Sequence, residues 1–118
     1  MTALFVYGTL MPGRLRWPLA APFVVEARSA TVVGTLLDTG LGYPGLRLGG
    51  QALVHGVHLH LHEPATLAWQ RLDEAEGPTF ERVAMVTSAG PAETYAWRHR
   101  ADGERVLVDG RWPLGAEQ

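Results

Sequence analysis

The sequence of 118 residues contains no cysteine and no lysine, and serine occurs at only two positions. Without cysteine the chain has no disulfide bond, no thiolate nucleophile and no cysteine-based zinc site. Without lysine it can form no Schiff base with a substrate, and the lysine of a phosphate-binding P-loop is missing. Neither Ser29 nor Ser88 lies in a G-x-S-x-G turn, so the nucleophile motif of the α/β-hydrolases is absent too.

Excess charge and long apolar runs are also scarce. The formal net charge of −2 gives no electrostatic basis for binding nucleic acid or an anionic membrane. No apolar run approaches the roughly 18 residues that a membrane-spanning helix needs, and the first residues lack the basic flank and apolar region of a secretory signal. We therefore expect no nucleic-acid partner, no membrane partner and a cytoplasmic location.

Three histidines are the best candidates for metal ligands. His58, His60 and His62 alternate along an expected strand and so share one face. Neighbouring pairs could share a metal ion, but His58 and His62 would lie ~13 Å apart. Because no further ligand has a matching spacing, we interpret the three as the polar face of a strand and predict no metal site.

The residues that are present predict one domain over residues 1–118, since 47% of them are hydrophobic. Its one clear helix begins at Pro64 and ends at Gly77, and a short helical turn is expected over residues 14–20. The segment from Trp112 to Leu114 should pack over the body. Strands, with a bend at Gly34, are expected over residues 3–8, 23–37, 51–61, 80–87, 93–99 and 105–108. The predicted fold class is α+β, a small mixed, mostly antiparallel β-barrel with one main helix.

The first strand runs directly into the turn Tyr7-Gly8-Thr9-Leu10. A turn at the end of a buried strand leaves backbone N–H groups without partners in the sheet. Such groups can hold a small anion or stabilise a developing oxyanion. Because strands often end in a turn with glycine, this loop predicts a site only together with a second feature.

The second feature is Glu76, in the last turn of the predicted helix. The helix dipole, partial burial and the like charge of Asp73 one turn earlier would each raise the pKa of Glu76 toward neutrality. A carboxyl group with such a pKa can accept a proton and later return it. The alternative is a solvated glutamate at a frayed helix end, and position alone does not decide between the two.

In their order and spacing, these segments resemble the γ-glutamylcyclotransferase-like superfamily, in particular its AIG2-like branch. The resemblance covers most of the chain. The matching segments are Tyr7-Gly8-Thr9-Leu10, Gly34-Thr35-Leu36, Tyr43-Pro44-Gly45-Leu46, Val54-x-Gly56 and Leu72-Asp73-x-x-Glu76-Gly77, with Phe80 and Arg82 after it. One departure is Phe80, which stands where the family has tyrosine and therefore lacks its hydroxyl group.

The resemblance implies a small β-barrel with a cavity that needs no cofactor. The best-studied members convert a γ-glutamyl amine into 5-oxoproline and a free amine. By this resemblance the loop from Tyr7 to Leu10 would hold the glutamyl group, Tyr43 would line the pocket, and Glu76 would be the general acid and base. Asp73 and Arg82 would form a structural pair.

The leading hypothesis is therefore a γ-glutamyl-amine cyclotransferase with a small-molecule substrate. The main alternative is a non-catalytic barrel that binds a small acidic metabolite or serves as an interaction module, and a third is a different lyase or hydrolase. Glu76 favours an enzyme, because a carboxylate with a raised pKa gives a cavity for anions no advantage. Phe80, in place of the family's tyrosine, favours a function that has diverged from that of the best-studied members. The amine released and the oligomeric state stay open.

Overall fold

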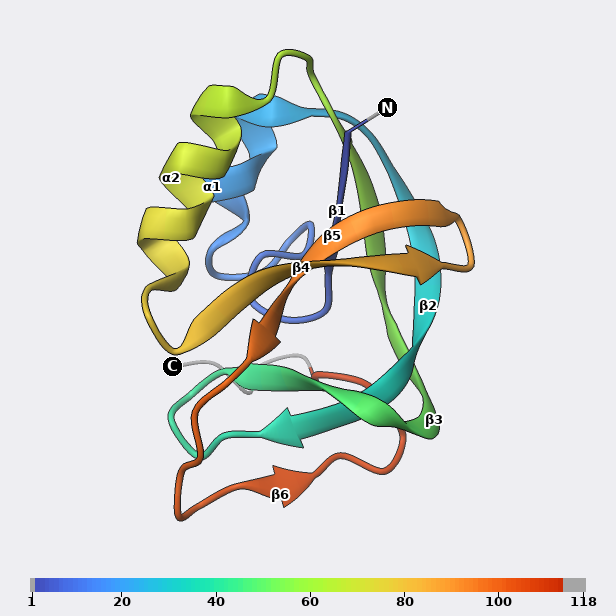
Figure 1. Cartoon of the computed structure of the whole chain (residues 1–118), viewed down its shortest axis with the longest axis vertical. Helices are drawn as coiled ribbons and strands as arrows, with labels where there is room; N and C mark the ends of the chain where they lie inside the picture. Colours follow the sequence, from blue (N-terminus) through green and yellow to red (C-terminus); the bar gives the residue numbers. More distant parts are fainter. Residues whose placement is uncertain (1, 114–118) are drawn as a thin grey trace.

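The computed structural model describes residues 2–113, and in these a curled sheet of six strands is covered by helices on one side (Figure 1). The sheet has the order β4-β5-β1-β3-β2-β6. The strands are β1 (Ala3–Val6), β2 (Val24–Asp38), β3 (Pro44–Leu61), β4 (Phe80–Thr87), β5 (Gly90–Trp97) and β6 (Arg105–Val106). The helices are α1 (Trp17–Ala20), the 3-10 turn η1 (Ala21–Phe23) and α2 (Thr66–Glu76). The expected α+β, barrel-like fold is confirmed.

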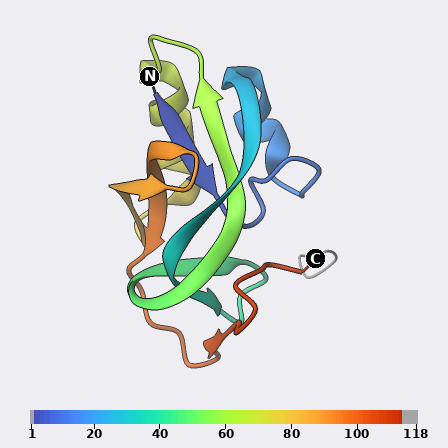
Figure 2. The same cartoon turned by 90° about the vertical axis from the view of Figure 1, so that its right-hand side faces the viewer.

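The long antiparallel ribbon of β2 and β3 gives the sheet its curl (Figure 2). Its register shifts between Gly34 and Thr35, at the bend that the sequence predicts. On one side of this bulge β3 pairs with β1, where Phe5 lies opposite His58. On the other side β3 turns back to β5, where Leu46 pairs with Ala96. The sheet thus nearly closes on itself around the end of β1.

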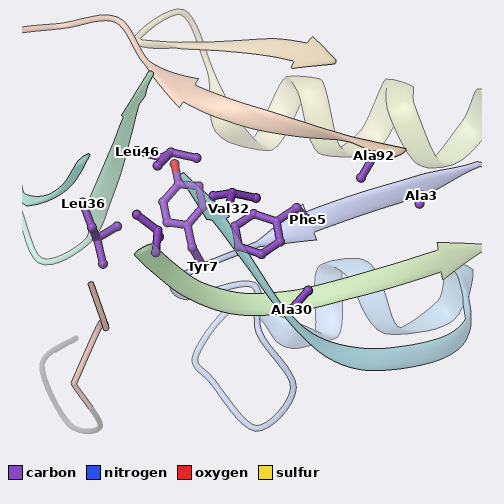
Figure 3. Close-up of a cluster of buried hydrophobic side chains, with 9 residues drawn as sticks. Ala3, Phe5, Tyr7, Ala30, Val32, Leu36, Leu46 and Ala92 are labelled. Atoms are coloured by element: carbon purple, nitrogen blue, oxygen red, sulfur yellow. The ribbon is translucent and has the colours of Figure 1, made fainter. Parts of the chain in front are cut away.

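Side chains of β1 alternate between two buried clusters, as the period of a strand requires. Phe5 and, just beyond the strand, Tyr7 lie inside the curl of the sheet, as Figure 3 shows. Leu4 and Val6 point to the other side and pack with Leu72 of α2. With apolar contacts on both faces, β1 fixes where the loop after it begins.

Helix α2 begins at Thr66, so the prediction that Pro64 is its first residue is wrong. Pro64 instead lies in the turn between β3 and the helix, where its missing N–H costs no hydrogen bond. The predicted end is confirmed, because Gly77 terminates the helix with a φ of +76°, a conformation that favours glycine. Ala68 and Leu72 supply the buried face of α2.

Several predicted boundaries shift by a few residues. The strand predicted over 3–8 stops at Val6, because the chain turns there; the one predicted over 93–99 covers Gly90–Trp97, paired along its length with β4. The strand predicted over 51–61 begins earlier, at Pro44, because the ribbon continues past the bulge. The strand predicted over 105–108 ends at Val106.

The predicted polar face of β3 is only partly present. His58 is 4% exposed and its Nε2 lies 3.3 Å from the carbonyl oxygen of Pro91, so it is a core residue, contrary to the prediction. It is buried because the turn between β4 and β5 folds over this part of the ribbon.

Trp112 is buried as expected, whereas Leu114 lies outside the described residues. Within residues 2–113, no helix has the length and apolar character needed to cross a membrane.

Candidate active site

A cavity of about 230 Å³ lies where the end of β1 meets the end of α2. The six residues that the sequence predicts for the site all line it: Tyr7, Gly8, Thr9, Leu10, Tyr43 and Glu76. Arg16, Phe80 and Tyr95 line it as well. The structure therefore brings together two segments that are more than sixty residues apart in the sequence, while the role of each residue stays a prediction.

Tyr7 anchors the loop rather than presenting its hydroxyl group to the cavity. Its side chain is buried, and its hydroxyl donates a hydrogen bond of 2.5 Å to the carbonyl oxygen of Tyr95. Burial, followed by the negative charge of Glu76, raises the pKa of Tyr7 well above its usual value. The hydroxyl therefore stays protonated and committed to β5, and it ties the loop to the sheet.

Gly8 allows two of the matching motifs to touch. A Cβ atom at this position would lie 2.4 Å from Cγ of Pro44, far closer than two carbon atoms can approach. The Tyr43–Pro44 segment can therefore pack directly on the backbone of the loop. This contact places the ring of Tyr43 beside the cavity, and it explains why a side chain at position 8 is incompatible with this arrangement.

The loop leaves three consecutive amides available. Two of its carbonyl groups accept hydrogen bonds: the Gly8 oxygen from the N–H of Met11 (3.1 Å) and the Thr9 oxygen from the N–H of Arg16 (2.8 Å). In residues 2–113 no acceptor is present for the N–H groups of Gly8, Thr9 and Leu10. Backbone donors without partners at the wall of a cavity can bind an anion or a carbonyl oxygen.

Glu76 is held in a poorly solvated position, and within residues 2–113 no group donates a hydrogen bond to its carboxylate. Only 10% of its side chain is exposed, and its nearest cation is Arg16, whose Nη1 lies 3.7 Å from Oε2. Burial raises the pKa of Glu76 to about 7, while the charge of Arg16 opposes that shift. A glutamate in this state exchanges its proton near neutral pH, which is the property a general acid and base requires.

Asp73 has no part in this shift, contrary to the expectation from the sequence. Its carboxylate accepts a hydrogen bond of 2.7 Å from the hydroxyl of Tyr95 and lies 3.1 Å from Nε of Arg82. The guanidinium of Arg82 also stacks on the ring of Trp69. Asp73 and Arg82 are therefore paired, and this pair compensates the charge that would otherwise act on Glu76.

Arg16 is the main residue that reasoning from the sequence missed. Besides its proximity to Glu76, its Nη2 donates to the carbonyl oxygen of Ala75 at 2.9 Å, while its own N–H donates to Thr9. It therefore ties the donor loop to the last turn of α2. Nothing in the local sequence marks this arginine, because its position depends on the path of the loop after β1.

An aromatic cluster stands beside one wall of the cavity, which Tyr43 and Phe80 line. The ring centroids of Tyr43, Phe80 and Trp97 lie 5.2–6.0 Å from one another. Behind them, Glu104 accepts a hydrogen bond of 3.0 Å from Nε1 of Trp97 and is paired with Arg47. Phe80 supplies this wall with packing but no hydroxyl group. Within residues 2–113, no group of three histidine, aspartate or glutamate side chains is placed to hold a metal ion.

Fold and cavity together define a small α+β protein in which a curled sheet and the helix α2 hold the carboxyl group of Glu76 at the wall of a cavity. The chain belongs to the γ-glutamyl cyclotransferase, AIG2-like family, whose model matches residues 4–114. The family predicted from the sequence motifs is therefore confirmed.

Individual relatives agree with this placement. A γ-L-glutamyl-butirosin B γ-glutamyl cyclotransferase from Niallia circulans is 33% identical over 104 residues, which are 84% of this chain. The chain spans only 66% of that relative's length. Among solved structures, an AIG2-like protein from Mus musculus has a TM-score of 0.75 at 19% identity, with 96% of this chain and 88% of that chain covered. Protein ytfP from Escherichia coli has a TM-score of 0.64 at 26% identity, with 96% and 97% covered.

Proposed function

We propose that the protein is a cyclotransferase that converts a γ-glutamyl amide into 5-oxoproline and a free amine. The observation that carries the proposal is the position of Glu76: a buried carboxyl group whose pKa is about 7 shares one cavity with three unpaired backbone N–H groups. The family match and the relative from Niallia circulans support the same reaction class.

The reaction is an intramolecular aminolysis in which the substrate provides both reacting groups. Glu76, as the carboxylate, accepts a proton from the α-ammonium group. The neutral α-amine then attacks the γ-carbonyl carbon, a C–N bond forms, and the carbonyl oxygen gains negative charge. Glu76 returns its proton to the nitrogen of the leaving amine as the amide C–N bond breaks, and the second proton of the attacking nitrogen passes to the departing amine, which leaves as its ammonium ion. The products are 5-oxoproline and the amine, and no other reactant is consumed.

The loop amides and the cavity supply what the carboxyl group cannot. The N–H groups of Gly8, Thr9 and Leu10 would stabilise the oxyanion of the tetrahedral intermediate. A cavity that holds the glutamyl chain folded brings nucleophile and carbonyl together, which can contribute ~7–11 kcal/mol in well-oriented intramolecular reactions. Such a reaction needs no cysteine or serine nucleophile, in keeping with the composition of the chain.

The test is incubation with a panel of γ-glutamyl amines and γ-glutamyl dipeptides, with 5-oxoproline as the measured product. Wild-type protein should release 5-oxoproline from at least one of them, and Glu76→Gln should release far less. Glu74→Gln is the matched control, because it makes the same change on an exposed residue of the same helix. A Glu76→Gln protein with the wild-type rate would remove Glu76 from the mechanism. A folded protein that is silent on the whole panel would favour the binding-module alternative.

A further inference from the structure

A second hollow of about 420 Å³ adjoins the cavity on its outer side. It shares Thr9, Arg16 and Tyr43 with the inner cavity, so these three residues separate an inner compartment from an outer one. The rest of the outer wall comes from Leu15, Leu41 and Gly42. A substrate held in the inner cavity by its glutamyl group would extend past Thr9 into this outer compartment, where its other half would lie.

The outer compartment is apolar at its rim. Leu15 is 60% exposed and Leu41 is 55% exposed, although they come from two different loops, one after β1 and one between β2 and β3. Because the two side chains come together at one hollow, they offer apolar surface that a ligand lying there would cover. The rim therefore fits an aliphatic or aromatic group rather than a strongly hydrated one.

Among the described residues that line the outer compartment, Arg16 is the one Asp, Glu, Lys, Arg or His side chain. The guanidinium uses Nη1 toward Glu76 and Nη2 toward Ala75, yet 32% of the side chain remains exposed. A guanidinium has five N–H donors, so capacity remains for a further acceptor. With Glu76 half protonated near pH 7, its charge is only partly compensated. This compartment therefore attracts an anion and repels a cation.

We propose that the outer compartment binds the leaving half of the substrate and selects an apolar amino acid whose α-carboxylate is bound by Arg16. This inference rests on the proposed function and names its substrate class: a γ-glutamyl dipeptide with an apolar second residue. The side chain of that residue lies between Leu15 and Leu41. Conjugates of polycationic amines are disfavoured, because they bring positive charge to Arg16 and a hydrated chain to the leucines.

The test compares two substrates that differ in a single group. γ-Glutamyl-L-leucine and the γ-glutamyl amide of 3-methylbutylamine have the same side chain, but only the first has a carboxylate. Wild-type protein should favour the leucine conjugate in kcat/KM by roughly tenfold, the lower end of the range for a hydrogen bond to a charged group. In Arg16→Gln the ratio of the two kcat/KM values should fall to about one. The ratio cancels any effect of the substitution on Glu76, since both substrates undergo the same chemistry.

Two further variants complete the experiment. Arg28→Gln makes the same change on an exposed arginine of β2 that is paired with Glu26, and its ratio should equal that of wild type. Leu41→Ser should lower kcat/KM for γ-glutamyl-L-leucine but not for γ-glutamylglycine, which has the carboxylate and no side chain. A wild-type ratio near one, or an unchanged ratio in Arg16→Gln, would overturn the proposal.

Calorimetric titration of wild-type protein with the two conjugates separates this proposal from the proposed function. If no 5-oxoproline forms but the leucine conjugate binds more tightly, and Arg16→Gln removes that preference, the outer site stands and the cyclotransferase activity fails. If both conjugates bind equally or neither binds, the outer site fails. If both are turned over at equal rates, the activity stands and the outer site fails.

Discussion

Glu76 and Glu104 show how the same side chain acquires opposite properties in two regions of one small molecule. Their side chains are similarly shielded, with 10% and 14% of the surface exposed. Burial raises the pKa of Glu76 to about 7, and within residues 2–113 it accepts no hydrogen bond. Glu104 accepts hydrogen bonds from Arg47, Trp97 and the N–H of Ala101, which lower its pKa to about 2.

The two side chains differ in desolvation, which dominates at Glu76 and is outweighed by hydrogen bonds at Glu104, and in the number of donors. Three donor groups satisfy Glu104 and make it a fixed anion that holds the segment after β5 in place. Glu76 has one arginine at 3.7 Å and a cavity in front of it. A carboxyl group without donors in a buried position is costly for the fold, and such positions occur where chemistry requires them.

The largest expected effect is on turnover. Glu76→Gln should lower kcat for 5-oxoproline release by roughly 10²–10⁴-fold, the range for loss of a general acid or base. Glu104→Gln should keep most of kcat but lower Tm, because its contacts hold structure and none of them reaches the cavity. Steady-state kinetics and thermal unfolding of both variants test this. If Glu76→Gln and Glu104→Gln both fold and lose kcat equally, the two glutamates do not differ in their roles as proposed.

The pH dependence of catalysis should follow Glu76 alone. The carboxylate form accepts the first proton, so kcat/KM should rise with pH through about 7. Arg16 lowers the pKa of Glu76. Arg16→Gln should therefore move the rising limb of the pH–rate profile to higher pH. Glu104→Gln should leave the limb in place. The measurement is a pH–rate profile of kcat/KM for the three proteins, and a limb that stays fixed in Arg16→Gln would separate Arg16 from Glu76.

The two glutamates should change stability with pH in opposite directions. Folded Glu76 binds its proton more tightly than the unfolded chain does, so the free energy of unfolding should fall as pH rises from about 4.5 to about 7. Glu76→Gln removes this loss and should be more stable than wild type at pH 8 by on the order of 1–3 kcal/mol, with no such gain at pH 4. Urea unfolding at both pH values measures this difference.

For Glu104 the sign is reversed. Its folded pKa is lower than its unfolded value, so its contribution to stability is fully present above about pH 4.5 and is lost as pH falls toward about 2. Glu104→Gln should therefore be less stable than wild type at pH 7, and the two urea midpoints should converge in strong acid. Midpoints that diverge further with falling pH would refute this assignment.

The smallest effect is expected for Asp73→Asn. The carboxylate of Asp73 is half exposed and paired with Arg82, so its loss should lower the free energy of unfolding by at most about 1 kcal/mol. Because burial rather than Asp73 raises the pKa of Glu76, the limb in kcat/KM should not move. A downward shift of that limb in the variant would restore Asp73 to the role that the sequence predicted for it.

Local sequence signals predicted the elements of the fold well. Gly77 ends α2, and Gly34 marks the bulge at which the β2–β3 ribbon bends. Both are local consequences of backbone conformation, which a single residue type can determine. The beginning of α2 was misplaced, because Pro64 suits a turn before a helix as well as the first position within it.

The site itself depended on long-range packing and was only partly predictable. The motif order placed Gly8 and Glu76 in one family pattern, but their meeting depends on how the β2–β3 ribbon curls. Arg16 could not be found in advance, since its partners Ala75 and Glu76 lie sixty residues away. The hydrogen bond of Asp73 could not be predicted either, because its donor, the hydroxyl group of Tyr95, comes from β5.

The unpaired amides of the loop after β1 have a consequence for how this protein can be redesigned. A main-chain donor survives replacement of the side chain beside it, so substitutions at positions 9 and 10 leave in place the N–H groups that we propose to bind the substrate. In the outer compartment, by contrast, the apolar surface and the positive charge come from the side chains of Leu15, Arg16 and Leu41, so substitutions there change them. If the proposed function holds, selectivity for the departing amine could thus be changed by substitutions at Leu15, Arg16 and Leu41 without replacing Glu76 or the loop amides.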